Sequence, residues 1–284
     1  EADFREILGV SYTALGQFRK AKENLSRTLE IREKAGGPKS AGVADALHNL
    51  AAAMFQNGEY EQAYVNYQRS FAIRRGVHKG DDKDVAFSLT HLAACEMKFG
   101  KYDEAERNYR EALDMRRRLY PGDHEDVAAS LNNLAKLYME RENAAAAEPL
   151  FRQSLEMIRG LKGGRALPVS HALHNLAGCL LESGRLAEAK ERYAQALDIR
   201  KEIDGPDHPR VASSTLGLAR TELAMGNLAE AERLARESLR MCRAKLRDSH
   251  PDTADSLEVL GGVLIAEDKA KEAEALLSEA VEIA

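Results

Sequence analysis

Two histidines three positions apart are the nearest approach to a metal site in this sequence. His171 and His174 would lie on one face of a helix, where both imidazoles could reach one ion. No cysteine or carboxylate completes the set, so we expect neither a metal nor a cofactor. The sequence also has no GxxxxGK[ST] loop, HExxH, GxSxG or Cys-x-x-Cys motif. We therefore expect a protein that is not an enzyme.

Cysteine content and net charge restrict the cell compartment and the class of partner. Cys95, Cys179 and Cys242 are odd in number and far apart, which favours reduced thiols in the cytoplasm over a disulfide framework. The column positions of Cys95 and Cys179 predict small packing residues. The net charge of −5 argues against nucleic acid, and no apolar run is long enough for membrane insertion. A protein or peptide partner is the expectation that remains.

A period of 42 residues organises the whole chain. The composition, rich in alanine and in charged residues (31%) and without tryptophan, favours helices. Leucine recurs without exception at Leu8, Leu50, Leu92, Leu134, Leu176, Leu218 and Leu260, and alanine at Ala21, Ala63, Ala105, Ala147, Ala189, Ala231 and Ala273. The period predicts a single solenoid domain, 1–284, of seven repeats. Their approximate ranges are 1–39, 40–81, 82–123, 124–165, 166–207, 208–249 and 250–284.

Each repeat is expected to form two amphipathic helices joined by a turn. In the fourth repeat the buried face of the first helix comprises Leu131, Leu134, Ala135 and Tyr138. Most turns carry glycine, as helix ends prefer. Glu142 and Asp268 replace it in two repeats, where we expect less regular turns. The run Arg116 to Arg118 indicates a solvated helix end.

The pattern L..LA..Y, then glycine, an aromatic residue and alanine, resembles the tetratricopeptide repeat. The 42-residue spacing, with HEDVAASLNNLAKLY (124–138) and ALDIRKEIDGPDHPRVA (196–212), resembles the kinesin-light-chain type. The resemblance implies an all-α, right-handed superhelical solenoid of seven repeats. It also implies that the first helices line a concave groove for extended peptides, with an asparagine at the position of Asn132 facing that groove.

Helical geometry at 100° per residue assigns further residues to this groove. Positions that turn away from the buried face form a polar stripe, a stripe of small residues and an apolar stripe. Two cations, Lys136 and Arg220, favour an acidic ligand, whereas Asn133 points toward the neighbouring repeat and predicts inter-repeat hydrogen bonding. The candidate groove residues are His48, Phe55, Thr90, Met97, Asn132, Lys136, Met139, His171, His174 and Arg220.

These features predict a protein–protein interaction scaffold that binds an extended peptide in the groove. One alternative is the regulatory or sensor segment of a larger signalling ATPase or another multidomain enzyme. Another is a structural module that self-associates through an uncapped C-terminal repeat, where Leu276, Leu277 and Val281 are apolar.

Overall fold

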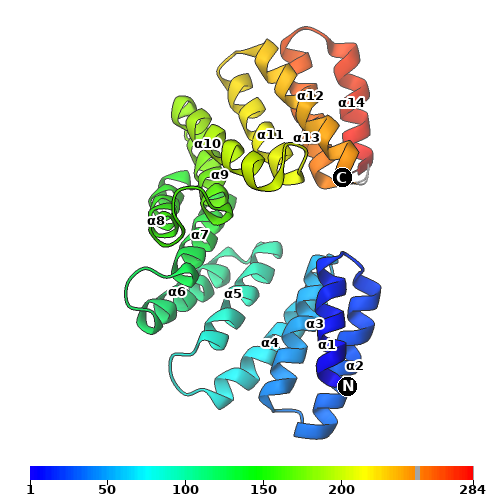
Figure 1. The fold of residues 1–284 in the computed structure, drawn as a ribbon, viewed down its shortest axis with the longest axis vertical. Coiled ribbons are helices and arrows are strands. Elements are labelled where there is room, and N and C mark those ends of the chain that lie inside the picture. The colour runs from blue at the N-terminus through cyan, green and yellow to red at the C-terminus, as the bar shows by residue number, and fades with distance from the viewer. Residues whose placement is uncertain (247–249, 284) are drawn as a thin grey trace. The chain divides into compact units, whose positions relative to one another are not determined.

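The computed structural model describes residues 1–246 and 250–283, and these form fourteen helices in seven successive pairs (Figure 1). Each pair lies inside one of the residue ranges expected from the period. The helices are α1 (Ala2–Ala14), α2 (Phe18–Gly36), α3 (Ala41–Gln56), α4 (Tyr60–Val77), α5 (Lys83–Lys98), α6 (Tyr102–Leu119), α7 (Glu125–Glu140), α8 (Ala144–Lys162), α9 (Leu167–Glu182), α10 (Leu186–Asp204), α11 (Pro209–Ala224), α12 (Leu228–Lys245), α13 (Pro251–Ala266) and α14 (Ala270–Ile283). The all-α solenoid of helix pairs is confirmed.

The repeated columns are the buried ones. Leu131 and Leu134 are 0% and 4% exposed, and Ala147, Ala189 and their equivalents are fully buried in the second helices. A methyl group at that place lets the two helices of a pair approach closely. Cys95, Cys179 and Cys242 are buried free cysteines, so the prediction that Cys95 and Cys179 are small packing residues is confirmed.

The turns between the two helices of a pair keep one backbone conformation. Gly58 and Gly184 have φ values of 81° and 72°, in the left-handed region that glycine tolerates best. Glu142 and Asp268 adopt the same conformation, with φ values of 54° and 61°. The prediction that these two turns are less regular is therefore wrong. The turn keeps its geometry in these two repeats, and Glu142 and Asp268 adopt a left-handed conformation that is strained for residues with a side chain.

Histidines begin three of the first helices. The Nδ1 atoms of His124, His208 and His250 each accept a hydrogen bond from the backbone N–H two residues later, at 3.1 Å. Asp82 performs the same task for α5 through its carboxylate. These caps satisfy N–H groups that a helix start leaves without partners, which explains the DHED, DHPR and SHPD loops.

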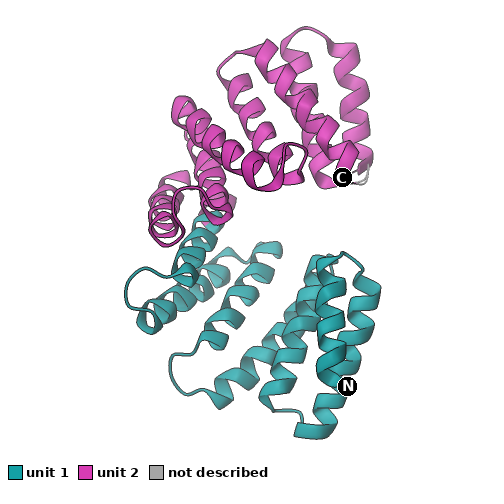
Figure 2. Ribbon diagram, in the orientation of Figure 1, with its two compact units in different colours: residues 1–137 teal, residues 138–284 magenta. Residues whose placement is uncertain are grey.

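By its internal contacts the chain divides into two compact units, residues 1–137 and 138–284, and the division falls within α7 (Figure 2). We call them unit 1 and unit 2. That residues 1–284 form one continuous solenoid domain stays a prediction. None of the described helices combines the length and the apolar character needed to cross a bilayer.

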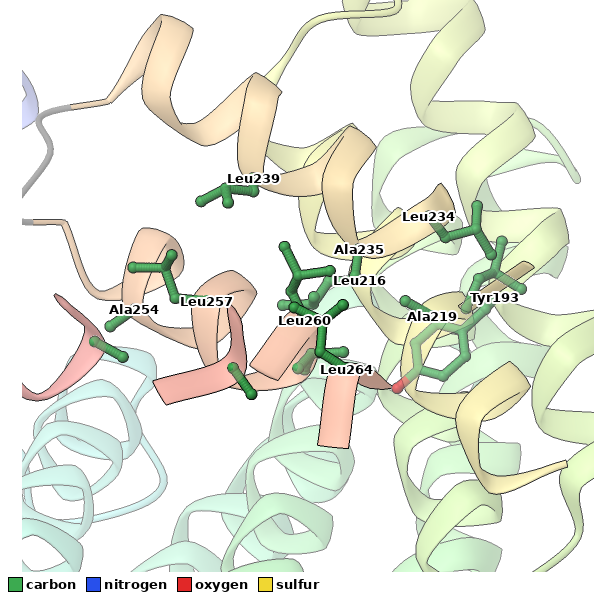
Figure 3. Close-up of a cluster of buried hydrophobic side chains, with 14 of the residues drawn as sticks. Tyr193, Leu216, Ala219, Leu234, Ala235, Leu239, Ala254, Leu257, Leu260 and Leu264 are labelled. Carbon is green, nitrogen blue, oxygen red and sulfur yellow. The ribbon is translucent and has the colours of Figure 1, made fainter. Parts of the chain in front are cut away.

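Unit 2 contains a large apolar cluster built from α9 to α14 (Figure 3). Tyr193 of α10 lies beside Ala219 of α11 and Leu234 of α12. Gly217 is required here, because a Cβ atom at that position would lie 2.3 Å from the Tyr193 ring.

Candidate functional site

The candidate site is the exposed side of the first helices, which we call the first-helix face. In unit 1 it comprises α1, α3, α5 and residues 125–137, and in unit 2 it comprises α9, α11 and α13. Neighbouring first helices contact one another, as α1 does α3 and α11 does both α9 and α13. Side chains 42 residues apart therefore form stripes along each face.

His48 lies beneath this face and not on it. Its side chain is 5% exposed, and its ring stacks on Phe87 of the next repeat, with the ring centroids 4.6 Å apart. His91 and Tyr67 enclose it from two further sides, with centroid distances of 4.8 and 5.1 Å. The prediction that His48 faces an open groove is therefore wrong, because the bulky Phe87 covers it.

Burial makes both histidines of this cluster poor bases. Desolvation, with the charges of His91 and Arg74, lowers the pKa of His48 to about 2. Desolvation, with the charges of Arg116 and Arg74, lowers the pKa of His91 to about 4. Both rings are consequently neutral near pH 7. They contribute aromatic packing to unit 1, not charge for a ligand.

Other members of the predicted polar stripe contact an arginine on the second helix of their own repeat. Thr90 accepts a hydrogen bond from Arg116 Nη1 at 3.1 Å, and His174 Nδ1 lies 3.4 Å from Arg200 Nη1. In the first repeat a carboxylate of Glu6 takes this place. Thr90 and His174 are half-buried. At these positions the stripe therefore contributes to the contact between the two helices of a pair. Asn132 occupies the same column and is also half-buried.

These second-helix arginines also tie each repeat to the next. Arg74 donates to Ser88 Oγ at 2.9 Å, Arg116 to Ser130 Oγ at 2.5 Å and Arg200 to Ser214 Oγ at 2.7 Å. Arg74 and Arg200 also donate to a backbone carbonyl of the following first helix. We call each such contact an arginine–serine joint.

The arginine–serine joint corrects one prediction and reveals a missed signal. Arg116 is 6% exposed, so the start of the run Arg116 to Arg118 is not a solvated helix end. Desolvation lowers the pKa of Arg116, and that of Arg200 to about 10. Where Ile158 replaces the arginine, Ala172 replaces the serine. The pairing is not uniform, since Arg32 precedes Ala46 and Cys242 precedes Ser256 at the same spacing, so this change is a partial signal of the joint in the sequence.

The column of Asn133 links adjacent repeats, as expected. Asn49 Nδ2 donates to Glu6 Oε1 of the preceding repeat at 2.8 Å. His91, in the same column, packs on His48 of the preceding repeat. The predicted inter-repeat hydrogen bond is confirmed at Asn49, and His91 makes an inter-repeat ring contact instead.

The apolar and cationic candidates are the ones that reach the surface. Phe55, Met97 and Met139 are half-buried, and Lys136 is exposed, while partial desolvation by surrounding protein lowers the pKa of its ammonium. In unit 2 the Arg220 side chain is 45% exposed, and its nearest carboxylate, that of Asp255, is 3.9 Å away.

Small and apolar residues surround Arg220. Its column holds Gly178 and Gly262 in the flanking repeats, and the next turn presents the half-buried Leu223 and the 54% exposed Ile265. An exposed cation bordered by glycines and aliphatic side chains can bind a carboxylate and an adjacent apolar side chain.

His171 is exposed and His174 half-buried. Within residues 1–246 and 250–283, no group of three or more histidine, cysteine, aspartate or glutamate residues could hold a metal ion.

Comparisons with known proteins identify the family. A tetratricopeptide repeat model matches residues 4–76, 84–160, 168–244 and 215–284. Among solved structures, BtubC (BKLC) from P. vanneervenii is 22% identical, with a TM-score of 0.66 over 79% of this chain and 90% of that one. A kinesin light chain from Podospora anserina with nearly identical repeats is 23% identical, with a TM-score of 0.59 over 72% and 96%.

A third structure, a signal transduction ATPase with numerous domains from Pyrococcus horikoshii, contains a tetratricopeptide repeat sensor. It is 18% identical, with a TM-score of 0.68, and the match covers 97% of this chain and 40% of that one. No curated protein matches in sequence. At these identities the structural matches establish the fold alone, and the family model establishes membership. The chain belongs to the tetratricopeptide repeat family, whose domains generally serve as protein-interaction modules.

Proposed function

We propose that the first-helix face binds an extended, acidic segment of a partner protein. The observation that carries the proposal is the arrangement at Arg220, where an exposed guanidinium lies among glycines and aliphatic side chains. The guanidinium would pair with a carboxylate of the segment, and Leu223 and Ile265 would take a neighbouring apolar side chain.

The residues of unit 1 support the same kind of ligand. The small Ala52 and Ala94 leave the backbone of α3 and α5 approachable, and Phe55 and Met97 present apolar surface one turn away. Lys136 supplies a second exposed cation. Of the ten predicted groove residues, we keep all but the buried His48 in this proposal.

The experiment selects ligands and then tests which face they use. Twelve-residue peptides would be selected from a random display library against the intact chain, and the enriched ones titrated by fluorescence anisotropy. We expect enrichment in aspartate and glutamate, and weaker binding to Arg220→Glu and Lys136→Glu. Arg107→Glu is the matched control, because Arg107 of α6 is a second-helix residue with a 70% exposed side chain. Equal affinity for all four proteins would contradict the proposal.

Self-association is a second candidate, favoured by the apolar surface of α14. Val281 is 78% exposed, and it lines an open pocket with Ile265 and Leu277. Burial of such surface against a second copy would be favourable. Light scattering over a concentration range, on the native chain and on Val281→Lys, tests it. A mass that stays that of one chain throughout would exclude this candidate.

A further inference from the structure

A cavity of about 520 Å³ opens between the second helices α10 and α12, above α11. Its apolar lining comes from Ala194, Leu197, Leu218 and Leu234. Charged side chains form its rim. It lies wholly within unit 2, and it contains none of the residues of the first-helix face used above.

Two departures from the repeat pattern create this cavity. Thr215 stands where five other repeats have leucine, and those five leucines are at most 2% exposed (Leu47, Leu89, Leu131, Leu173 and Leu257). Ala194 stands where other repeats have a long polar side chain (Gln68, Arg110, Arg152 and Arg236). The contact between the fifth and sixth repeats therefore lacks both the side chain that fills this space and the one that covers it.

The hydroxyl of Thr215 lacks a hydrogen-bond partner within the described residues. Thr215 lines the cavity and is 0% exposed, and its Oγ1 has no hydrogen-bond partner among the described residues. A buried hydroxyl without a partner is costly. A ligand atom that reaches the floor of the cavity could supply the missing partner.

One positive charge of the rim also lacks a counter-ion. Glu222 pairs with Lys190 at 2.7 Å, and Arg233 pairs with Glu230 at 2.7 Å and with Glu237 at 3.0 Å. Lys201 forms no ion pair within the described part of the chain. Its counterparts Arg75 and Arg243 each pair with a glutamate 36 residues later, both at 2.6 Å. For Lys201 that glutamate is Glu237, which Arg233 already holds.

The Thr215 hydroxyl and the Lys201 ammonium lie at the same end of the cavity. Helices α10 and α11 are antiparallel neighbours, and the Lys190–Glu222 pair marks one end of their contact. Two helical turns from that pair, Leu197 of α10 comes level with Thr215 of α11. Lys201 is one turn further along α10. An ammonium at the rim and a hydroxyl at the floor thus border one end of an apolar cavity.

We propose that this cavity binds a small carboxylate with an aliphatic body. The carboxylate would pair with Lys201 and accept the hydrogen bond of the Thr215 hydroxyl, and the aliphatic part would lie against Leu197, Leu218 and Leu234. Lys190 and Arg233 already pair with the three glutamates of the rim, so a single carboxylate is the group that Lys201 could take. Such a group occurs in free carboxylic acids and at the C-terminus of a peptide that ends in leucine.

The test follows methyl resonances of the threonine and leucine residues during titration of the intact chain. The probes are 4-methylpentanoate, its uncharged amide, and N-acetyl-Gly-Gly-Leu with a free C-terminus. We expect the acid to cause saturable shifts at Leu197, Leu218 and Leu234 and to bind more tightly than the amide. Binding of the free acid without the peptide assigns the site to a small molecule. Binding of both the acid and the peptide assigns it to a chain end.

Three variants distinguish a real site from general apolar adsorption. Thr215→Leu restores the side chain of the other repeats and should abolish the shifts while the chain stays folded. Ala194→Arg, which covers the cavity as in those repeats, should do the same. Lys201→Gln should weaken binding of the acid by about 2- to 5-fold, and Lys245→Gln, an exposed lysine of α12 outside the lining, should not.

Absence of saturable shifts with the acid would overturn the proposal, as would undiminished binding to Thr215→Leu. Equal affinities for the acid and the amide, unchanged by Lys201→Gln, would overturn the assignment to a carboxylate. None of these outcomes depends on Arg220 or Lys136, so the result is independent of the proposed peptide binding.

Discussion

Replacement of Thr253 by valine should stabilise the protein. Thr253 lies in the first turn of α13 and is 0% exposed, and its Oγ1 has no hydrogen-bond partner in the part of the chain that the structure describes. Five other repeats have valine in this column, at most 2% exposed (Val43, Val85, Val127, Val169 and Val211). Valine has the shape of threonine, so the substitution removes the unsatisfied hydroxyl without leaving a cavity.

The magnitude follows from the cost of an unpaired buried group. Mutational data place that cost at about 1–3 kcal/mol for a neutral polar group. The methyl group that replaces the hydroxyl packs in an environment that accepts valine in five repeats. We therefore expect Thr253→Val to raise the free energy of unfolding by about 1–2 kcal/mol.

Urea unfolding followed by circular dichroism measures this change, and Thr221→Val is the matched control. Thr221 is equally buried, but its Oγ1 donates to the carbonyl of Gly217 at 2.8 Å. The same chemical change there should lower stability by about 0.5–1.5 kcal/mol. If Thr253→Val is neutral or destabilising, or if both variants shift stability alike, hydrogen-bond satisfaction does not govern these positions.

Three further predictions concern the histidine cluster, the arginine–serine joint and one turn. Because burial lowers the pKa of His48 to about 2 and of His91 to about 4, only the unfolded chain binds these protons between about pH 6.5 and 4. Stability should therefore fall as the pH falls, by about 2 kcal/mol per histidine at pH 5. Urea titrations at pH 7.5 and pH 5 should show most of this loss disappear in His48→Asn/His91→Asn, and an unchanged pH dependence would refute the assignment. Arg116→Ala should cost about 2–4 kcal/mol, whereas Arg116→Ile with Ser130→Ala should stay within about 1 kcal/mol of the native chain. Equal losses in these two variants, measured by thermal unfolding, would show that pairing is irrelevant to the joint. Glu142→Gly should add about 1 kcal/mol by relieving a left-handed residue, and an unchanged or lower Tm would contradict the strain.

The repeat period made the helices and their buried faces predictable. Leu134 and Ala147 recur in every copy, and the structure buries them because each copy presents the same stripe to its neighbours. The link through Asn49 was predictable for the same reason: its direction follows from helical geometry alone.

Contacts that depend on a single neighbouring side chain were not predictable in this way. His48 is buried because Phe87 is an aromatic residue in a column that otherwise holds small or polar ones. A helical wheel of one repeat carries no information about the size of a residue in the next repeat. Arg116 was misjudged because its partner, Ser130, lies 14 residues away across a loop. The paired change to Ile158 and Ala172 was visible in the sequence, but only when two columns are compared together.

The arginine–serine joint restricts how such an array can be shortened or rearranged. A repeat that ends in Arg74, Arg116 or Arg200 needs a serine hydroxyl from the repeat that follows it. Joining such a repeat to one with alanine at the serine position would remove this acceptor. Arg32, which precedes Ala46, instead donates to Glu6 and to the Gly42 carbonyl. The repeats have similar shapes, but the residues at their boundaries differ. A recombined array should therefore join repeats so that an arginine of this column still meets a serine hydroxyl.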